Sequence, residues 1–304
     1  MLKILLWVVS NDGRFFNGAI NILERQHNGV DLVGITANVP IQLAKNGEKV
    51  NFIPLNEVYQ ESFDVLLVVG ARQIGMSNIT KVAAQLKFPV EKLLGDWIVC
   101  IPGFTLDKYR KLQRSRLSIF SRNCFGGLIS NTLGLPFLSP FVNMFFEERE
   151  YIRFLRAPRV YMEEQLVFKQ KAFEKNQQIY YPVFTLGNIN LHFNHYDKAN
   201  ENDFNERKRR INWYNLFVTM WTEDAEILQE FDALPYGKKV CFVPFKSDLD
   251  SAWYINFSTK EDPERGTPYS RFGKVVNDFA RGKPFYYDPF DMLLYGKKTQ
   301  LIDM

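Results

Sequence analysis

Residues 3–9 read Lys3-Ile4-Leu5-Leu6-Trp7-Val8-Val9, a nearly continuous apolar run that predicts a fully buried β-strand. An amphipathic segment at 17–26 follows, and a second apolar run occupies 31–36. A strand, a helix and a strand in such close succession are typical of a βαβ unit, in which a crossover helix joins two parallel strands. This opening stretch therefore favours an α/β fold built on a parallel sheet.

The same alternation continues through the first third of the chain. We expect strands at 50–53, 64–70 and 97–101, with a helix at 78–86. Strands that are apolar along their whole length are typical of a parallel sheet covered by helices on both faces. The sequence thus predicts a Rossmann-like domain over residues 1–115. A basic connector at 102–116, expected to be helical, ends this domain.

A second mixed α/β domain is expected over residues 116–304. Its predicted strands lie at 117–121, 188–196, 216–220 and 239–244. Its predicted helices lie at 147–155, 202–213 and 223–234, and the charged segment 163–178 is interpreted as a connection. The order of these elements again favours an α/β fold class.

Composition excludes several classes of protein. The 304 residues are 46% hydrophobic and 24% charged, which is typical of a globular chain, and the net charge of +4 is too small to predict nucleic-acid binding. The three cysteines are far apart and lack metal-ligand spacing, so we expect neither a disulfide framework nor a zinc site. A reducing, cytoplasmic location fits this pattern. Since the apolar run at 4–9 is far shorter than a membrane span, no membrane insertion is expected.

The most informative candidate site is the polar turn that follows the strand at 117–121. It reads Ser121-Arg122-Asn123-Cys124-Phe125-Gly126-Gly127. Arg122, Asn123 and backbone amides are expected to bind a phosphate or carboxylate, and Gly126 and Gly127 are expected to let the chain turn close to a ligand. Cys124 is a candidate nucleophile, although an unreactive buried thiol explains it as well.

Two loops of the first domain are candidate cofactor sites. Gly13 and Arg14 lie in the first strand-to-helix turn, but the glycine spacing departs from a dinucleotide-binding fingerprint. Gly70 and Arg72 follow a buried strand, at the edge where open α/β sheets bind ligands. The identity of any cofactor stays open at this point.

His192 and His195 are candidates for acid–base chemistry because imidazoles titrate near neutral pH. In a regular strand two residues three positions apart point to opposite faces, so this pair is not expected to bind a metal. His192 shares its polar face with Asn194, an arrangement suited to sugar hydroxyls. Hydrogen-bonded structural histidines are the alternative interpretation.

A cluster of cations at 206–213 includes Arg210, which we expect to hold an anion together with Arg122. A solvated, ion-paired helix face is the alternative. The glutamates at 147–150 stand at the start of a predicted helix, where stabilisation of the helix dipole is favoured over catalysis.

Several ordered segments between 117 and 245 resemble a family of bacterial proteins labelled exopolysaccharide biosynthesis proteins. The matching segments are Ser121–Gly127, Leu133-Gly134-Leu135, Ser139-Pro140-Phe141, Tyr151–Leu155, Tyr181-Pro182, Leu186-Gly187, His192–Tyr196, Arg209–Trp213, Asn215-Leu216-Phe217, Phe231-Asp232 and Leu234-Pro235-Tyr236. In fold pattern, the first domain resembles the Rossmann-like domains of nucleotide-sugar enzymes and sugar acyltransferases. The resemblance implies a role in polysaccharide assembly.

Together these features predict a protein that binds a sugar, sugar phosphate or nucleotide-sugar, with a transferase as one option. Arg122 and the two histidines are expected to meet in one polar cleft. Two other classes compete with this hypothesis: a non-enzymatic adaptor of polysaccharide machinery, and a thiol-dependent hydrolase or acyltransferase that uses Cys124 and a histidine.

Overall fold

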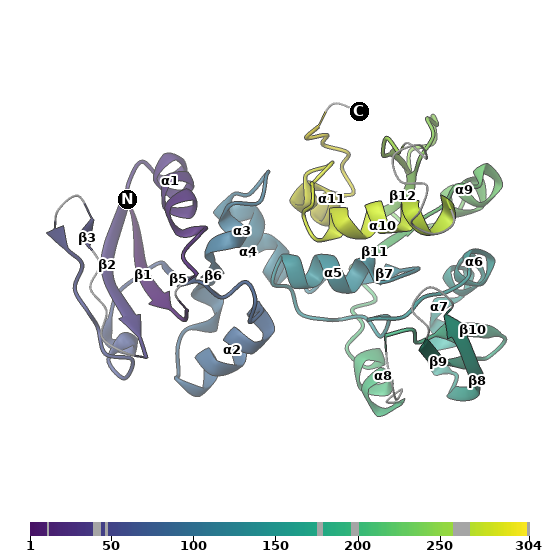
Figure 1. Cartoon of the computed structure of the whole chain (residues 1–304), viewed down its shortest axis with the longest axis horizontal. Helices are drawn as coiled ribbons and strands as arrows, with labels where there is room; N and C mark the ends of the chain where they lie inside the picture. The colour runs from purple at the N-terminus through teal and green to yellow at the C-terminus, as the bar shows by residue number, and fades with distance from the viewer. Residues whose placement is uncertain are drawn as a thin grey trace. The chain divides into compact units, whose positions relative to one another are not determined.

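The computed structural model describes residues 1–10, 12–38, 44–45, 48–174, 179–195, 201–257 and 268–302. The chain forms two compact units, which Figure 1 draws mainly in purple and blue for the first and in teal to yellow for the second. Unit 1 contains Met1–Tyr109 and Leu133–Pro136, and unit 2 contains Arg110–Thr132 and Phe137–Met304. Both units are built from parallel strands and helices, which confirms the predicted α/β fold class.

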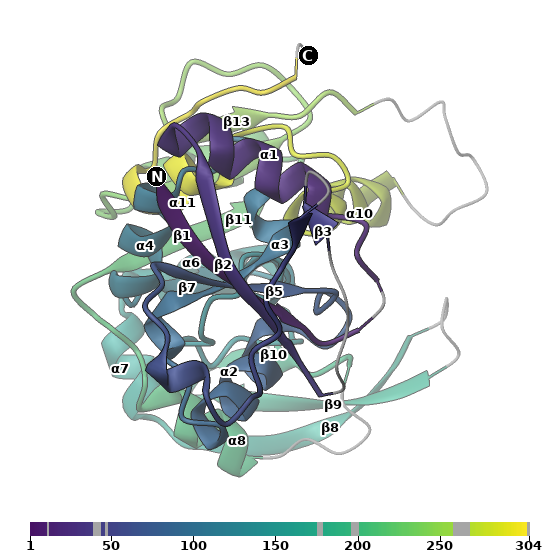
Figure 2. The same ribbon diagram turned by 90° about the vertical axis from the view of Figure 1, so that its left-hand side faces the viewer.

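Unit 1 is organised around a parallel sheet of four strands in the order β2-β1-β5-β6. Figure 2 shows β1, β2 and β5 side by side. The strands are β1 (Leu2–Val8), β2 (Val30–Ala37), β5 (Val65–Val69) and β6 (Leu93–Gly95). The helices are α1 (Phe16–His27), α2 (Met76–Gln85) and α3 (Asp96–Val99), with 3-10 turns η1 (Val58–Gln60) and η2 (Val90–Lys92) and a small hairpin of β3 (Ala44–Lys45) and β4 (Glu48–Lys49). All five side chains of β5 are buried, which explains the unbroken apolar run of its sequence.

The strand order of unit 1 reverses at β1. Strand β2 lies on one side of β1, and the chain then crosses to form β5 on the other side. The loops after β1 and β5 therefore meet at one edge of the sheet. In open α/β sheets such a reversal, at the carboxyl ends of the strands, is where ligands bind.

Unit 2 contains a second parallel sheet, of order β13-β12-β11-β7. Its strands are β7 (Ser118–Ser121), β11 (Leu216–Trp221), β12 (Lys239–Val243) and β13 (Ala252–Tyr254). Its helices are α5 (Phe125–Thr132), α6 (Glu148–Arg156), α7 (Pro158–Glu163), α8 (Glu201–Lys208), α9 (Ala225–Asp232), α10 (Pro268–Ala280) and α11 (Pro289–Tyr295), and α4 (Leu106–Arg114) spans the change from unit 1 to unit 2. The predicted strands at 117–121, 216–220 and 239–244 are thus confirmed within a residue or so at each end.

A three-stranded antiparallel sheet of order β10-β9-β8 is also part of unit 2. Its strands are β8 (Leu166–Glu174), β9 (Ile179–Leu186) and β10 (Ile189–His192), and Figure 2 shows β8 and β9 as a long extended pair. Its buried side chains join an aromatic core in which the rings of Phe141 and Phe154 lie 5.0 Å apart. Along β10 the burial alternates, with Ile189 and Leu191 buried and Asn190 and His192 half-buried, as the sequence pattern predicted.

Five local expectations differ from the structure. Residues 97–101 were expected to form a strand, but Asp96–Val99 is helix α3 and the strand β6 comes just before it, because a short apolar run cannot distinguish a buried helix from a buried strand. The charged segment 163–178 contains strand β8, which lies at a sheet edge and so keeps exposed polar side chains.

The helix expected at 202–213 ends at Lys208. A strand was expected at 50–53, but in this segment only Phe52 forms a β-bridge, which pairs it with Ile35. The strand expected at 188–196 ends at His192, and both Tyr196 and Asn11 of the first turn lie outside the described residues.

None of the helices in the described ranges is both long enough and apolar enough to cross a bilayer.

Candidate functional site

Ser121 stabilises the turn that connects β7 to α5. Its hydroxyl donates to the carbonyl of Asn123 at 2.6 Å and accepts the backbone N–H of Gly126 at 3.0 Å. The Asn123 side-chain oxygen accepts the backbone N–H of Phe125 at 3.1 Å, as helix-capping residues do. Ser121 is buried, so its hydroxyl serves the backbone rather than a ligand.

Gly126 and Gly127 are in the first turn of helix α5, whereas the sequence prediction had placed them in the turn itself. A Cβ at Gly126 would lie 2.8 Å from the Ser121 hydroxyl oxygen and 3.1 Å from the Ile119 side chain. At Gly127 the nearest atom would be a Val142 methyl group at 3.4 Å, an ordinary contact. The start of helix α5 packs closely against β7, and of the two glycines only Gly126 is required by this packing.

Arg122 is only 4% exposed, and protein groups surround its guanidinium. Nη1 donates to the Glu148 carboxylate and to the Trp221 carbonyl, both at 2.8 Å, and Nε donates to the Phe146 carbonyl at 3.2 Å. The guanidinium also lies over the Trp221 ring, 4.2 Å from its centroid. Arg122 thus links the ends of β7 and β11 to the start of α6.

Glu148 and Glu223 bring two carboxylates to this edge of the sheet. Glu148 begins α6 and is paired with Arg122, while Glu223 lies between β11 and α9. Burial and the charge of Glu148 both raise the pKa of Glu223. One carboxylate oxygen of Glu223 is buried without a hydrogen-bond partner among the described residues. The Glu148 carboxylate is thus paired with a guanidinium, and the pKa of the Glu223 carboxyl is raised.

Cys124 and Asn123 face helix α10. The Asn123 amide donates to the Asn277 side-chain oxygen at 3.3 Å. Burial raises the pKa of the Cys124 thiol to about 11, and the nearby Arg281 offsets only part of this effect. The thiol is therefore protonated at neutral pH, which disfavours a nucleophilic role.

The ring of His192 stacks on Phe145, with centroids 4.5 Å apart and an interplanar angle of 18°. The Tyr181 hydroxyl lies 3.4 Å from Nδ1, and burial lowers the pKa of this histidine. His192 and Phe145 exchange backbone hydrogen bonds at 3.0 and 2.9 Å, and the Phe146 N–H donates to the Arg122 carbonyl at 2.8 Å. The segment at 145–146 thus lies between His192 and Arg122, as a strand lies between its two neighbours.

His195 is exposed in the turn after β10, and partial burial together with the charge of Arg281 lowers its pKa. The charge of Arg281 also lowers the pKa of Cys124, so both groups lie within electrostatic range of this guanidinium. The side-chain oxygen of Asn194 is buried without a hydrogen-bond partner among the described residues. These groups extend the polar edge beyond the turn at 122–124.

Arg210 lies at the opposite edge of the sheet from Arg122. It precedes β11, and the neighbouring Asn212 N–H donates to the Ser118 hydroxyl at the start of β7 at 2.8 Å. Arg122 follows the end of β7, so the two arginines are separated by the length of the strands, roughly 15 Å. They do not hold one anion together. Arg210 is 52% exposed and pairs with Glu206 one helical turn away, at 3.2 Å.

The cofactor candidates of unit 1 do come together, at the edge where the strand order reverses. Gly70 has φ of +80°, and a Cβ there would lie 2.5 Å from the Ser10 hydroxyl oxygen. The close contact with Ser10 is therefore sufficient reason for a glycine at position 70, and a bound phosphate is not needed to explain it. Gly13 has open space around it, and Arg72 lies over the Phe15 ring at 5.1 Å.

Arg14 is occupied by Asp12 through two bonds of 2.7 Å, and the hydrogen bond from Arg14 lowers the pKa of Asp12. Close by, Asp96 is fully buried, and burial raises its pKa to about 6. It accepts the Trp97 N–H at 2.9 Å, but its second oxygen has no hydrogen-bond partner in the described part of the chain.

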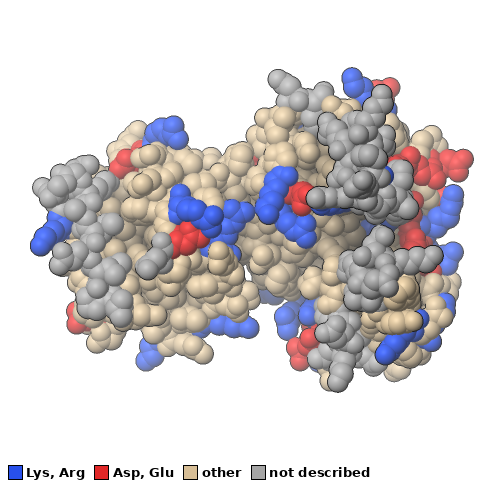
Figure 3. Space-filling model, viewed as in Figure 1, with Lys and Arg blue, Asp and Glu red and all other residues tan. Residues whose placement is uncertain are grey.

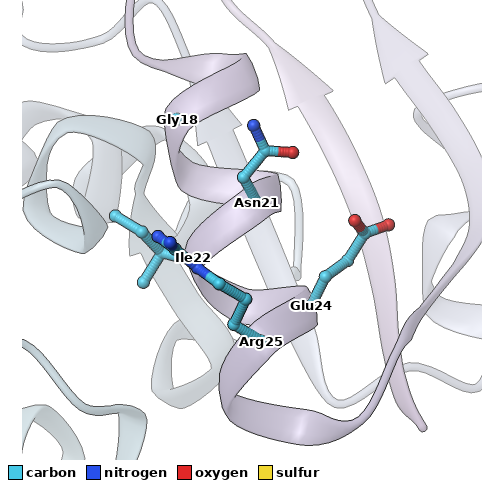
Figure 4. A pocket seen from close by; sticks show the side chains of 5 residues that line it. All are labelled: Gly18, Asn21, Ile22, Glu24 and Arg25. Carbon is cyan, nitrogen blue, oxygen red and sulfur yellow. The ribbon is translucent and has the colours of Figure 1, made fainter.

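A groove of about 580 Å³ runs along the outside of helix α1 and is lined by Gly18, Asn21, Ile22, Glu24 and Arg25. Figure 4 shows all five on the one helix, with Ile22 and Arg25 projecting to one side and Asn21 and Glu24 to the other. Such a surface does not converge on a ligand. Within the described ranges, no three His, Cys, Asp or Glu side chains are grouped to hold a metal ion.

Residues 99–273 match the family model "Domain of unknown function (DUF1919)". The chain belongs to the DUF1919 family. An uncharacterized protein of Haemophilus influenzae is 33% identical over 190 residues, which are 60% of this chain and 84% of that relative. A crystal structure of aspartate semialdehyde dehydrogenase II complexed with ASA from Vibrio cholerae aligns over 72% of this chain and 68% of that one. Its identity is 9% and its TM-score 0.25, a match too weak to carry an argument.

The DUF1919 region contains the turn at 121–127, both histidines, Glu148 and Glu223. Asn277, Arg281 and most of unit 1 lie outside it. The family description names no reaction, so the polysaccharide role implied by the resemblance is a proposal.

Sequence reasoning missed Glu223, Asp96 and Asn277 and set Glu148 aside as a helix-start residue. A carboxylate directly after a predicted apolar strand was the available signal for Glu223, because strand ends gather at one edge of a parallel sheet. Nothing local marked Asn277, which reaches the site through the packing of α10 against α5.

Proposed function

We propose that unit 2 binds a sugar, sugar phosphate or nucleotide-sugar at the carboxyl edge of its parallel sheet and transfers a group from it during cell-surface polysaccharide assembly. This edge is where open α/β sheets bind their ligands. The cysteine pattern supports a cytoplasmic location for this activity.

The observation that carries the proposal is the pair of carboxylates in unlike surroundings. Glu148 is paired with Arg122 at 2.8 Å, and burial beside Glu148 raises the pKa of Glu223. Enzymes that act on glycosidic or phosphate esters assign different proton-transfer roles to two carboxylates through such differences in environment. A raised pKa also makes the Glu223 carboxylate a stronger base.

Each group then has a distinct role. Glu223 accepts the proton of the attacking hydroxyl while the hydroxyl oxygen bonds to the anomeric carbon of the donor sugar. The bond from that carbon to the phosphate or nucleotide breaks, and the phosphate or nucleotide leaves with the bonding electrons. Glu148, positioned by Arg122, orients the sugar or stabilises positive charge on it. Asn123 and Asn194 offer amide groups to ligand hydroxyls. Arg281, which pairs with Asp278 at 3.2 Å and lies within electrostatic range of His195, supplies a positive charge for a phosphate.

A thermal-shift screen of the full chain against nucleotide-sugars, sugar phosphates and dinucleotides tests the binding. A ligand present at 100 times its dissociation constant adds about 2.7 kcal/mol to the free energy of unfolding. The hit is then used as substrate, with release of nucleotide or phosphate as the readout. Absence of any stabilising member of these classes would contradict the proposal.

The variant Glu223→Gln tests the chemistry. It should leave binding of the hit intact and lower turnover by about 100-fold or more, because general acid–base groups contribute that much. Glu226→Gln is the matched control, since Glu226 is nearby in sequence but 83% exposed. Equal turnover in both variants would remove Glu223 from the mechanism.

One observation favours the adaptor as a second candidate. The β8–β9 pair exposes large apolar side chains, with Val167, Phe168, Phe173 and Tyr180 between 43% and 68% exposed. Exposed apolar groups that lie close together are typical of docking surfaces. If serine at Phe173 and Tyr180 abolishes co-purification of a partner while the ligand screen finds no hit, the adaptor function replaces the transferase.

A further inference from the structure

A polar pocket of about 500 Å³ lies in unit 2 beside the edge strand β13. One wall is the segment after β12, with Lys246, Ser247 and Asp248. The lining also contains Tyr254 at the end of β13, and Lys298 and Gln300 from the segment after α11. The volume is in the range of small-molecule sites, roughly 300–1,000 Å³.

The walls of this pocket are attached to the sheet. Tyr287, which also lines the pocket, is buried, and its hydroxyl donates to the Tyr254 carbonyl. The Lys298 ammonium donates to the Ala252 carbonyl at 2.8 Å. The Leu301 N–H donates to the Tyr286 carbonyl at 2.9 Å, which holds the last segment in place. The pocket is thus a built feature of the fold rather than a gap between loose loops.

Charge in the pocket favours an anion. The residues that line it include two lysines, Lys246 and Lys298, and one acidic residue, Asp248. Burial lowers the pKa of Lys298. Figure 3 shows basic and acidic side chains interspersed on the face it presents, so a local excess of positive charge is a property of particular sites and not of the whole surface. A ligand with one negative charge would balance this pocket.

The other lining groups favour a sugar. The Ser247 hydroxyl accepts the Leu249 N–H at 3.3 Å and so retains its own proton to donate. The Gln300 amide nitrogen donates to the Ile302 carbonyl at 2.7 Å, which leaves its oxygen available as an acceptor in the pocket. Hydroxyls of a sugar both donate and accept hydrogen bonds, and the half-buried Tyr254 offers an apolar ring beside them.

We propose that this pocket binds an anionic monosaccharide, that is, a sugar unit with one phosphate or carboxylate group. The ammonium groups of Lys246 and Lys298 bind the anion. Tyr254, Ser247 and Gln300 bind the sugar. This site does not depend on the function proposed for the sheet edge, because it shares none of the residues assigned there.

Isothermal titration calorimetry of the full chain with four probes tests the proposal. The probes are glucose 6-phosphate, glucuronate, glucose and inorganic phosphate. We expect glucose 6-phosphate or glucuronate to bind at least ten-fold more tightly than glucose and than inorganic phosphate. Whichever binds identifies the anionic group. If glucose binds as tightly as the charged sugars, the pocket does not recognise an anionic group. If inorganic phosphate binds as tightly, the pocket does not recognise a sugar. If no probe binds, the proposed site is wrong.

Substitutions then locate the binding. Lys246→Gln removes one exposed ammonium from the lining and should weaken the best probe about ten-fold. Lys297→Gln is the matched control, because Lys297 is exposed, next to Lys298, and outside the lining. Equal weakening by both variants would mean a general attraction of charge and contradict the pocket. If binding of the best probe depends on Glu223 and not on Lys246, the probe binds at the sheet edge, and the proposed site beside β13 is wrong.

Discussion

Arg122 carries a full charge in a position almost closed to solvent, and three protein groups accept its hydrogen bonds. A buried charge of this kind is stable only while its partners are present. Arg122 therefore has a positioning role at the proposed site: it holds Glu148 in place next to Glu223.

This role makes Arg122 and Arg210 a matched pair for a stability measurement. Arg122→Met should lower the free energy of unfolding by about 3 kcal/mol, because it leaves Glu148 and two carbonyl groups without their donor. Arg210→Met should change it by less than about 0.5 kcal/mol, since its ion pair is on the surface. Urea unfolding followed by tryptophan fluorescence measures both, and similar losses in the two variants would contradict the assignment.

Cys124 offers a direct chemical test of the thiol-dependent alternative. With a pKa of about 11, the thiol is almost entirely protonated at pH 7, so iodoacetamide should leave it unmodified while a cysteine peptide reacts. Mass spectrometry of the tryptic peptides detects the adduct. Stoichiometric labelling of Cys124 in the folded chain at pH 7 would restore the nucleophile hypothesis.

At the scale of elements, helix α5 starts close to β7, and this approach depends on one of its two glycines. Ser121 binds the helix start, and Gly126 leaves room for the Ser121 hydroxyl. Strand-to-helix packing thus explains the sequence pattern Ser-x-x-x-x-Gly of residues 121–126, and the polar residues of the turn face α6 and α10.

The two glycines of α5 should respond to alanine with opposite sign. Gly126→Ala should destabilise the chain by about 1–3 kcal/mol, because its Cβ would lie 2.8 Å from the Ser121 oxygen. Gly127→Ala should be neutral or stabilise by up to about 0.5 kcal/mol, because alanine favours the helix and meets only an ordinary contact. Thermal unfolding of both variants measures the difference, and a stabilised Gly126→Ala variant would show that the contact relaxes freely.

At the scale of the whole molecule, each unit has its own parallel sheet with polar groups at the carboxyl edge. In unit 1 a buried carboxyl belongs to Asp96, the first residue of helix α3, which directly follows β6. Burial raises its pKa from 3.8 to about 6. The native state therefore binds this proton more tightly than the unfolded chain does.

Unit 1 should accordingly lose stability as the pH rises. The contribution of the Asp96 proton is complete below about pH 4 and is lost as the pH rises through about 6. Asp96→Asn should remove this dependence and stabilise unit 1 at pH 7 by roughly 1–3 kcal/mol. Hydrogen exchange resolved by peptide separates unit 1 from unit 2, whose peptides serve as the internal control. A pH dependence in unit 1 that is the same in the variant would contradict the assignment to Asp96.

The sequence was a good guide where one periodicity dominated. The apolar runs of β1, β5, β7, β11 and β12 were identified because a strand buried on both faces consists mostly of apolar residues. The segment at 97–101 was misassigned because Trp97, Ile98 and Val99 are buried in a helix, and burial on all sides leaves no period to read. Strand β8 was missed for the opposite reason, since an edge strand exposed to solvent loses its apolar pattern.

The chain alone determined the α/β class, the parallel strands and the loops that carry polar residues at strand ends. These features could be read because apolar periodicity and turn residues are local patterns of the sequence. The tertiary structure decided which of those residues meet. It separated Arg122 from Arg210 by the length of a sheet, enclosed Arg122 among protein acceptors, and brought Glu148, Glu223 and Asn277 to the same edge. Such meetings depend on strand order and helix packing, which arise from contacts between residues far apart in the chain and leave no local pattern in it.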